Sequence, residues 1–240
     1  MSFVQANLMG QTTTQGDSHA ISVPVPASQA GDLILINFTQ GFNFDVVNWP
    51  SGFSLIKSYK RANPYFSNFL FAKLAGSSEP TTFVFNLGAD ATITYRSIIV
   101  RGVNSNQPIL SITERLGSGA TISVEGINLQ QGSLVMAFIG RYSNSGGTNY
   151  PDNWTFISSG YNGMAFYQIF GGASQTENPI ILYYSGDNND YWQVWLVELG
   201  DANPIIYNTI FINWLLTDEP GSKLWVKING EWKPAKVTII

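Results

Sequence analysis

Side chains that commonly do chemistry are scarce in this chain of 240 residues. His19 is the only histidine and there is no cysteine, so a Ser-His-Asp arrangement would have to use His19. Glycoside hydrolysis would instead need two carboxylates about 5–10 Å apart, which on a β-strand means alternate positions. Glu198, in VWLVELG at 194–200, is the clearest acid on an expected strand, and no expected strand holds an acid-x-acid pair. We therefore expect no catalytic residues.

One loop could offer oxygen ligands to calcium, namely GDNNDY at 186–191. The same residue types favour a hairpin turn by themselves, and we expect a turn. With a single histidine and no cysteine, neither a metal site nor any other cofactor is expected.

The strongest positive signal is aromatic. Tyr, Phe and Trp occur together with Asn, Ser and Gly in four segments, at 41–50, 63–69, 141–154 and 159–163. Flat aromatic faces beside amide and hydroxyl groups suit both sugars and protein surfaces. The candidate ligand-binding residues in these segments are Phe42, Phe44, Tyr65, Phe66 and Tyr142.

The elements that must position these residues belong to an internal duplication. ISVPVPASQAGDLI at 21–34 returns as ISVEGINLQQGSLV at 122–135, and NWPSGFSLIKS at 48–58 returns as NYPDNWTFISS at 149–159. Ten of these twenty-five positions are identical, where composition alone would give about one or two. Aromatic residues kept in both copies are expected in the core, and they are Trp49, Phe53, Tyr150 and Trp154.

The later part of the repeat shows smaller offsets, as loop deletions would produce. FLFAKLAG at 69–76 matches MAFYQIFG at 164–171, and SIIVRGV at 97–103 falls opposite VWLVELG at 194–200.

Short segments rich in Val, Ile, Phe, Tyr and Thr alternate with Gly, Pro, Asn and Asp clusters, which is typical of an all-β fold. We expect a jelly-roll-like β-sandwich over 1–203, built from duplicated halves at about 20–103 and 121–200. A tandem of two small sandwiches is the alternative. Strands are expected at 21–25, 33–39, 53–59, 68–75, 81–87 and 92–101, and again at 122–127, 133–140, 154–159, 163–170, 180–185 and 190–199.

Residues 204–240 form a different, C-terminal extension. LWVKINGEWKPAKVTII predicts a β-hairpin around Asn229-Gly230, because a type I′ turn needs positive φ at both central residues. A lone hairpin is marginally stable in water, so the extension is expected to dock on the sandwich or on another chain. Its candidate docking residues are Trp214, Trp225 and Trp232.

Composition excludes several classes of partner. Charged residues make up 12% of the chain and the net charge is −4, so no basic surface invites nucleic acid. The apolar runs are far shorter than the roughly 20 residues of a membrane-spanning helix, and the first residues lack the pattern of a secretory signal. We expect a protein made in the cytoplasm that leaves the cell only by another route, such as lysis.

Several motifs resemble a β-sandwich module frequent in virion proteins of tailed bacteriophages and prophages. The resemblance rests on four stretches in order: SVPVPASQAGDLILINFT, WPSGFSLIKSY, FAKLAGSSEPTTFVF and SIIVRGVNSNQPI. Its motif residues fall on Ala30-Gly31-Asp32-Leu33, on Pro50-Ser51-Gly52-Phe53 and on Ala75, Gly76, Glu79 and Pro80, with Phe53 in place of the usual Trp. The tail LWVKINGEWKPAKV looks like short Lys-x-Asn-Gly-x-Trp-Lys hairpins near the ends of phage tail and fibre proteins.

The resemblance implies a virion protein without enzymatic activity. We expect a tail fibre or baseplate-associated adhesin that contacts the host surface, with surface polysaccharide as ligand. Its other partners would be virion proteins and copies of itself, with a trimer as the first expectation. The alternatives are a capsid decoration or tail joint protein without a receptor role and, less favoured, a polysaccharide depolymerase.

Overall fold

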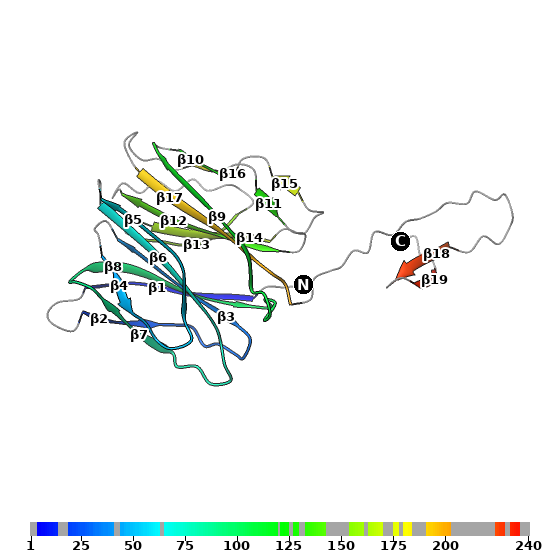
Figure 1. Cartoon of the computed structure of the whole chain (residues 1–240), viewed down its shortest axis with the longest axis horizontal. Helices are drawn as coiled ribbons and strands as arrows, with labels where there is room; N and C mark the ends of the chain where they lie inside the picture. The colour runs from blue at the N-terminus through cyan, green and yellow to red at the C-terminus, as the bar shows by residue number, and fades with distance from the viewer. Residues whose placement is uncertain are drawn as a thin grey trace. The chain divides into compact units, whose positions relative to one another are not determined.

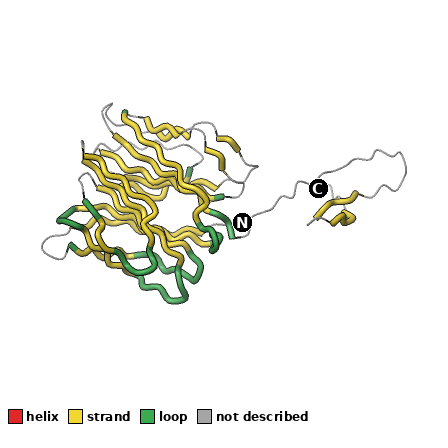
Figure 2. Tube along the Cα trace, in the orientation of Figure 1, coloured by secondary structure: helices red, strands yellow, loops and turns green. Residues whose placement is uncertain are grey.

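The computed structural model describes most of the chain as strands and loops, without a helix (Figure 2). The described residues are 4–13, 19–40, 44–62, 65–119, 121–124, 127–129, 133–142, 154–160, 163–169, 175–177, 180–183, 191–202, 224–228 and 231–235. Within these ranges no helix is long and apolar enough to cross a membrane. The chain divides into two compact units, Met1–Pro204 and Ile205–Ile240.

Unit 1 contains two sets of strands, one from each copy of the repeat. The first set is β1 (Val4–Thr13), β2 (Ala20–Pro24), β3 (Leu33–Gln40), β4 (Val46–Asn48), β5 (Ser54–Ala62), β6 (Tyr65–Leu74), β7 (Thr82–Leu87) and β8 (Thr92–Arg101). The second set is β9 (Ile109–Ser118), β10 (Thr121–Val124), β11 (Ile127–Leu129), β12 (Leu134–Tyr142), β13 (Thr155–Gly160), β14 (Gly163–Ile169), β15 (Gln175–Glu177), β16 (Ile180–Tyr183) and β17 (Tyr191–Leu199).

Each half builds its own large sheet, and the two sheets have the same strand order. The first half forms an antiparallel sheet of order β1-β8-β3-β6-β5, and the second half forms the corresponding order β9-β17-β12-β14-β13. Even an irregularity is repeated, because the β5–β6 pairing shifts register between Leu55 and Lys57 and the β13–β14 pairing shifts between Phe156 and Ser158, both 101 positions later. The repeated phrase in the sequence therefore encodes a repeated strand-and-bulge framework.

Two cores share the faces of the first large sheet, because side chains alternate along a strand. On β3, Ile34 and Ile36 face the small sheet β2-β7-β4 and belong to a core with Phe71 and Phe85. Their neighbours Leu33 and Leu35 belong to a second core together with residues of the other large sheet. The run LILINFTQ is thus continuously apolar at its start because both of its faces are covered.

The second core joins the two halves. It combines Leu70 and Ile98 of the first half with Met136, Trp195 and Val197 of the second. The two large sheets therefore pack face to face, as Figure 1 shows, with the first half's small sheet on one outer side and the short pairs β10–β16 and β11–β15 belonging to the second half.

These observations confirm the all-β, sandwich-like class expected from the sequence. The arrangement combines features of both organisations considered above. The two halves do form one sandwich through their large sheets, yet the first half also has its own small sheet and its own core. The jelly-roll connection pattern stays a prediction.

Two findings correct the strand predictions made for unit 1 from the sequence. Strands β1, β4, β9 and β15 were not expected, and β1 and β9 each form an edge of a large sheet. In addition, Leu33 pairs with Val100 and its equivalent Leu134 pairs with Leu199, so β8 and β17 correspond at an offset of 99. The offset of 97 inferred from the matched segments is wrong by two residues, a slip that keeps every side chain on the same face.

Unit 2 contains the expected hairpin. Strands β18 (Leu224–Ile228) and β19 (Glu231–Ala235) pair antiparallel, with Ile228 opposite Glu231. The two residues between them, Asn229 and Gly230, lie outside the described residues, so the turn type stays a prediction.

Candidate functional site

The large sheets of unit 1 have two ends with different residue types. We call the end where β3 and β12 begin the motif end, and the end where they finish the loop end. Contacts between the halves show that the two loop ends coincide. Asn68 on β6 donates a hydrogen bond to Gln193 on β17 (2.6 Å), and the guanidinium of Arg61 on β5 lies 3.6 Å from the ring centre of Tyr191 on β17.

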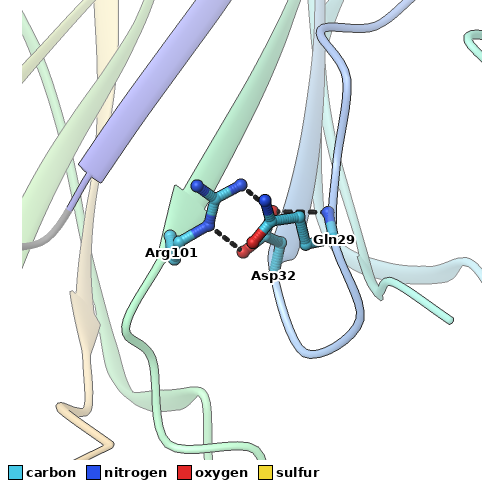
Figure 3. Close-up of polar contacts among 3 residues, drawn as sticks. All are labelled: Gln29, Asp32 and Arg101. Carbon is cyan, nitrogen blue, oxygen red and sulfur yellow. Dashed lines mark hydrogen bonds and ion pairs between the residues drawn. The ribbon is translucent and has the colours of Figure 1, made fainter. Parts of the chain in front are cut away.

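An ion pair holds the motif end of the first half (Figure 3). Arg101 donates from Nε and Nη2 to the two carboxylate oxygens of Asp32, each at 2.9 Å, and the backbone N–H of Gln29 donates to the same carboxylate at 2.8 Å. Asp32 is only 2% exposed. The hydrogen bonds to Asp32 outweigh the effect of burial and raise the pKa of Arg101 above its ordinary value.

Backbone hydrogen bonds complete this end. The N–H of Gly31 donates to Ala75 O and the N–H of Ala75 donates to Asp32 O, at 2.9 and 2.8 Å. Gly31 has φ of 85°, a conformation that glycine adopts without strain. The Ala-Gly-Asp-Leu and Arg-Gly-Val motifs thus lie next to each other in the fold. The contacts of Gly31, Asp32 and Arg101 give these motif residues a structural role.

The aromatic segments singled out by the sequence all reach the loop end. Segment 41–50 begins where β3 stops, 63–69 includes the start of β6, 141–154 begins at the last residues of β12, and 159–163 includes the end of β13 and the start of β14. Pairing places Gln40 opposite Ser67 in one sheet and Tyr142 opposite Tyr191 in the other. Four segments distant in sequence therefore start or finish at one end of the unit.

A buried polar cluster lies beneath the loop end, between the two large sheets. Asn37 donates to the side-chain oxygen of Asn68 at 2.6 Å, and Asn68 donates in turn to Gln193. All three side chains are fully buried. Gly140 makes the close approach possible, because a Cβ there would lie 2.8 Å from Asn68 Nδ2. The cluster joins the halves by hydrogen bonds where the apolar core stops.

Two buried arginines belong to the same region. Arg96 donates to Thr39 Oγ1 at 3.1 Å and is 0% exposed, and Arg141 is 5% exposed. Burial, and then the nearby charge of Arg141, lower the pKa of Arg96 to about 9. Arg96 therefore remains charged at neutral pH, in an interior position where a charge is costly unless it is hydrogen-bonded.

The structure separates the predicted ligand-binding residues into three groups. Tyr65 is 53% exposed and is the first residue of β6, at the loop end. Phe44 and Phe66 are 3% and 1% exposed, so they are core residues and the prediction that they contact a ligand at the surface is corrected. Phe44 packs on Phe69 with ring centres 4.9 Å apart, and Phe66 packs on Tyr59 at 5.2 Å.

The other two predicted ligand-binding residues are less fully described. Phe42 lies outside the described residues. Tyr142 is described by its place at the end of β12 only. Of the aromatic residues kept in both copies, Phe53 and Trp154 are core residues as expected, at 6% and 5% exposed, whereas Trp49 packs against the core but is only partly buried. Tyr150 lies outside the described residues.

Sequence reasoning missed the stacking of Arg61 on Tyr191. It brings a cation from the first half onto an aromatic ring of the second, a contact that is favourable within about 6 Å of the ring centre. The two residues are far apart in the sequence, and Tyr191 stands at the end of a segment that reads as a turn. Only the pairing of the two sheets reveals the contact.

The predicted docking tryptophans belong to unit 2. Trp225 lies on β18 opposite Pro234, and Trp232 lies on β19 opposite Lys227. Trp214 lies outside the described residues.

The remaining chemical groups take simple roles. His19 Nδ1 lies 2.9 Å from a carboxylate oxygen of Asp90 in a solvent-exposed pair. Glu198 accepts a hydrogen bond from Ser111, and Glu114 accepts one from the indole of Trp195. The loop at 186–190 lies outside the described residues. Among those that are described, no three His, Cys, Asp or Glu side chains gather as metal ligands would.

Comparisons with protein-family models, with characterised proteins and with solved structures give no match to this chain.

Proposed function

We propose that the chain is a bacteriophage virion protein, a tail fibre or baseplate-associated adhesin whose loop end contacts polysaccharide on the host surface. The single observation that carries the proposal is that each of the four aromatic, Asn- and Ser-rich segments starts or finishes at the same end of unit 1. The virion context comes from the resemblance of the sequence motifs to phage β-sandwich modules.

The described residues at the loop end fit this role. Tyr65 offers an exposed ring, and a tyrosine ring contributes both an apolar face and a hydroxyl to a sugar. The Arg61–Tyr191 contact and the buried Asn37–Asn68–Gln193 chain hold the two halves together directly below. A recognition surface composed of segments from both halves requires such a fixed base.

Weak sites gain strength from copy number. A shallow sugar site has modest affinity, and several copies on one particle raise the effective affinity without new contacts. We propose that the protein forms a homo-oligomer, a trimer first, with unit 2 attaching it to itself or to other virion proteins. The chain would be made in the host cytoplasm and released with the particle.

The test is binding of the fluorescently labelled full chain to intact candidate bacterial hosts, with and without competing surface polysaccharide. The proposal expects saturable binding that the polysaccharide competes away and that Tyr65→Ala and Tyr142→Ala each weaken. Asn106→Ala, a change at an exposed linker residue of the motif end, is the matched control and should leave binding unchanged. Absence of binding to every host, even with the protein multimerised on beads, would contradict the proposal.

A second candidate is a capsid decoration or tail joint protein without a receptor role. Two observations favour it: Phe44 and Phe66 are buried, which leaves fewer aromatic side chains for a ligand, and unit 2 is a compact unit of its own. In that case removing unit 2 should abolish incorporation into particles, whereas Tyr65→Ala should leave host binding of the particles unchanged.

A further inference from the structure

A second mixed polar and aromatic surface lies away from the loop end, on the small sheet of the first half. It is a shallow, open depression of about 540 Å³. Its lining includes Asn48, Trp49, Lys73, Thr82, Val84 and Asn86. Thr82, Val84 and Asn86 alternate along β7, whose intervening residues are buried, so this row faces outward. Asn86 pairs with Asn48 of β4, which places the two amide-bearing residues side by side.

The aromatic wall of the depression is fixed in position. Trp49 donates its indole N–H to Phe53 O at 3.1 Å, and its ring packs on Phe71 with centres 5.2 Å apart. The ring is half-buried, so one part is anchored while another part lines the depression. Gly52 has φ of 87° in the turn that follows, and Phe53 N–H donates to Pro50 O across that turn. The Pro-Ser-Gly-Phe motif therefore sets the orientation of Trp49.

A cation is fixed beside this wall. Lys73 donates to a carboxylate oxygen of Glu79 at 2.7 Å, and the other carboxylate oxygen accepts the backbone N–H of Gly76 at 2.7 Å. The side chains of Lys73 and Glu79 are only 17% and 7% exposed. Lys73 runs close to Gly52, where a Cβ would lie 3.0 Å from its Cε. The ammonium thus has a defined place, and donors remain on it beyond the one bound to Glu79.

We propose that this depression is a saccharide-binding site, separate from the loop end. A rigid indole edge, two neighbouring amides, a threonine hydroxyl and an ammonium whose charge Glu79 balances match a small, neutral, hydroxyl-rich ligand. A single sugar unit is the occupant that fits such mixed groups, since a protein partner would need a larger and more apolar contact. The inference goes beyond the proposed function: Asn48 and Trp49 belong to segment 41–50, but they lie at the small sheet and not at the loop end, where that segment begins.

The second half is not expected to repeat the site. Ile34 pairs with Lys73 and its equivalent Val135 pairs with Gln168, so Gln168 takes the place of Lys73. Ile21 pairs with Phe85 and Ile122 pairs with Leu182, which makes Tyr183 the counterpart of Asn86. The ammonium and one of the two amides are therefore missing from the second copy, and one site per chain is predicted.

The test is an NMR titration of the 15N-labelled full chain with methyl glycosides of glucose, galactose, rhamnose, N-acetylglucosamine and glucuronic acid. Trp49→Phe identifies the Trp49 indole signal. We expect saturable shifts of that signal with at least one sugar, and a dissociation constant on the order of millimolar. Asn86→Ala should weaken binding about fivefold through the lost hydrogen bond. Val84→Arg, a change at a 51% exposed position, should fill the depression and abolish binding.

Controls separate this inference from the proposed function. Asn106→Ala should leave the titration unchanged, and so should Tyr65→Ala, which removes a loop-end ring. Shifts that appear only at the loop end and vanish with Tyr65→Ala would overturn the inference while supporting the proposed function. No saturable shift with any sugar up to its solubility limit would also overturn it. So would shifts at Trp49 that follow protein concentration alone, because a second copy of the chain would then be the occupant.

Discussion

The two halves of unit 1 close the same end of the same sheet in different ways. In the first half a side-chain ion pair joins Asp32 to Arg101. Strand pairing makes Ser133 and Gly200 the equivalent residues of the second half, so both members of the ion pair are missing together. There the linker between the halves takes over, since Asn104 N–H donates to Gly200 O at 2.8 Å.

The linker also explains why position 200 is a glycine. The N–H of Gly200 donates to Pro108 O at 3.1 Å. A Cβ on Gly200 would lie 2.9 Å from Gln107 O, which is too close for any real side chain. The duplication has therefore kept strand order and bulge position while the contacts that complete each sheet have diverged. Residues that are similar in the two copies therefore belong to the strand framework. Residues that differ between the copies contact different neighbours.

The facing surfaces of the two large sheets differ in the same manner. Asn37 pairs with Arg96 in the first half, and the equivalent positions in the second half are Phe138 and Trp195. All four side chains are 0% exposed. At these two pairs of positions the first half has polar side chains and the second half has aromatic rings, which makes the halves non-interchangeable.

The largest effect should come from the aromatic side of this interface. Trp195→Ala removes the largest fully buried side chain among the described residues, together with its hydrogen bond to Glu114, and should lower the free energy of unfolding by about 4 kcal/mol. Urea denaturation measures the change. Leu116→Ala, at a 54% exposed position of β9, is the control and should change stability little. A small loss for Trp195→Ala would mean that the halves do not depend on this core.

The polar side should show a smaller but clear effect. Asn68→Ala leaves Gln193 without its hydrogen-bond donor in a buried place and should cost about 3 kcal/mol. The measurement is again urea denaturation, with Asn106→Ala as the exposed asparagine control. Equal stability of the two variants would contradict the account of the cluster as a bond between halves.

The motif-end comparison can be tested by exchanging residues between halves. Asp32→Ser gives the first half the residue of the second, and should cost about 2 kcal/mol through the hydrogen bonds lost by a buried carboxylate. Asp45→Ser breaks an exposed ion pair with Lys60 instead, and should cost less than about 1 kcal/mol. The reverse exchange Ser133→Asp should gain nothing, since Gly200 offers no cation. A gain in thermal stability would contradict the equivalence.

The smallest effect concerns Glu79, and it depends on pH. Burial alone would raise the pKa of Glu79, but the hydrogen bonds from Gly76 and Lys73 and the charge of Lys73 together lower it. A lowered pKa in the folded state stabilises the protein above the unfolded pKa, and this contribution is lost as the pH falls through the folded value. Glu79→Gln should therefore cost about 1 kcal/mol at neutral pH and nothing in strong acid. The measurement is the free energy of unfolding of the original chain and of Glu79→Gln as a function of pH. A stability difference that persists in strong acid would exclude the ionised Lys73–Glu79 pair as its cause.

The sequence predicted the framework better than the surface. Apolar alternation and recurrence located β3 at 33–39 against the observed Leu33–Gln40, and the Asn-Gly signal located the hairpin of unit 2. The edge strands β1 and β9 were not predicted because their own pattern of apolar residues is weak. They form by pairing with β8 and β17. The two-residue slip in β17 escaped because it exchanges residues of the same face.

The candidate sites were less predictable for a related reason. Phe44 and Phe66 read as loop aromatics, but whether an aromatic side chain faces a core or solvent depends on which sheet covers it. The Arg61–Tyr191 contact and the depression around Trp49 arise from segments brought together by the fold, and no local pattern marks them.

The central claim is that the motif end of unit 1 stabilises the fold while the loop end binds the host, and one paired measurement tests it most directly. Thermal melting and binding to host cells would be recorded in parallel for Asp32→Ser and Tyr65→Ala. We expect the Asp32→Ser protein to melt at a lower temperature and bind as before, and the Tyr65→Ala protein to melt as before and bind more weakly. If Tyr65→Ala binds normally while Asp32→Ser, still folded, loses binding, recognition lies at the motif end and the account is wrong.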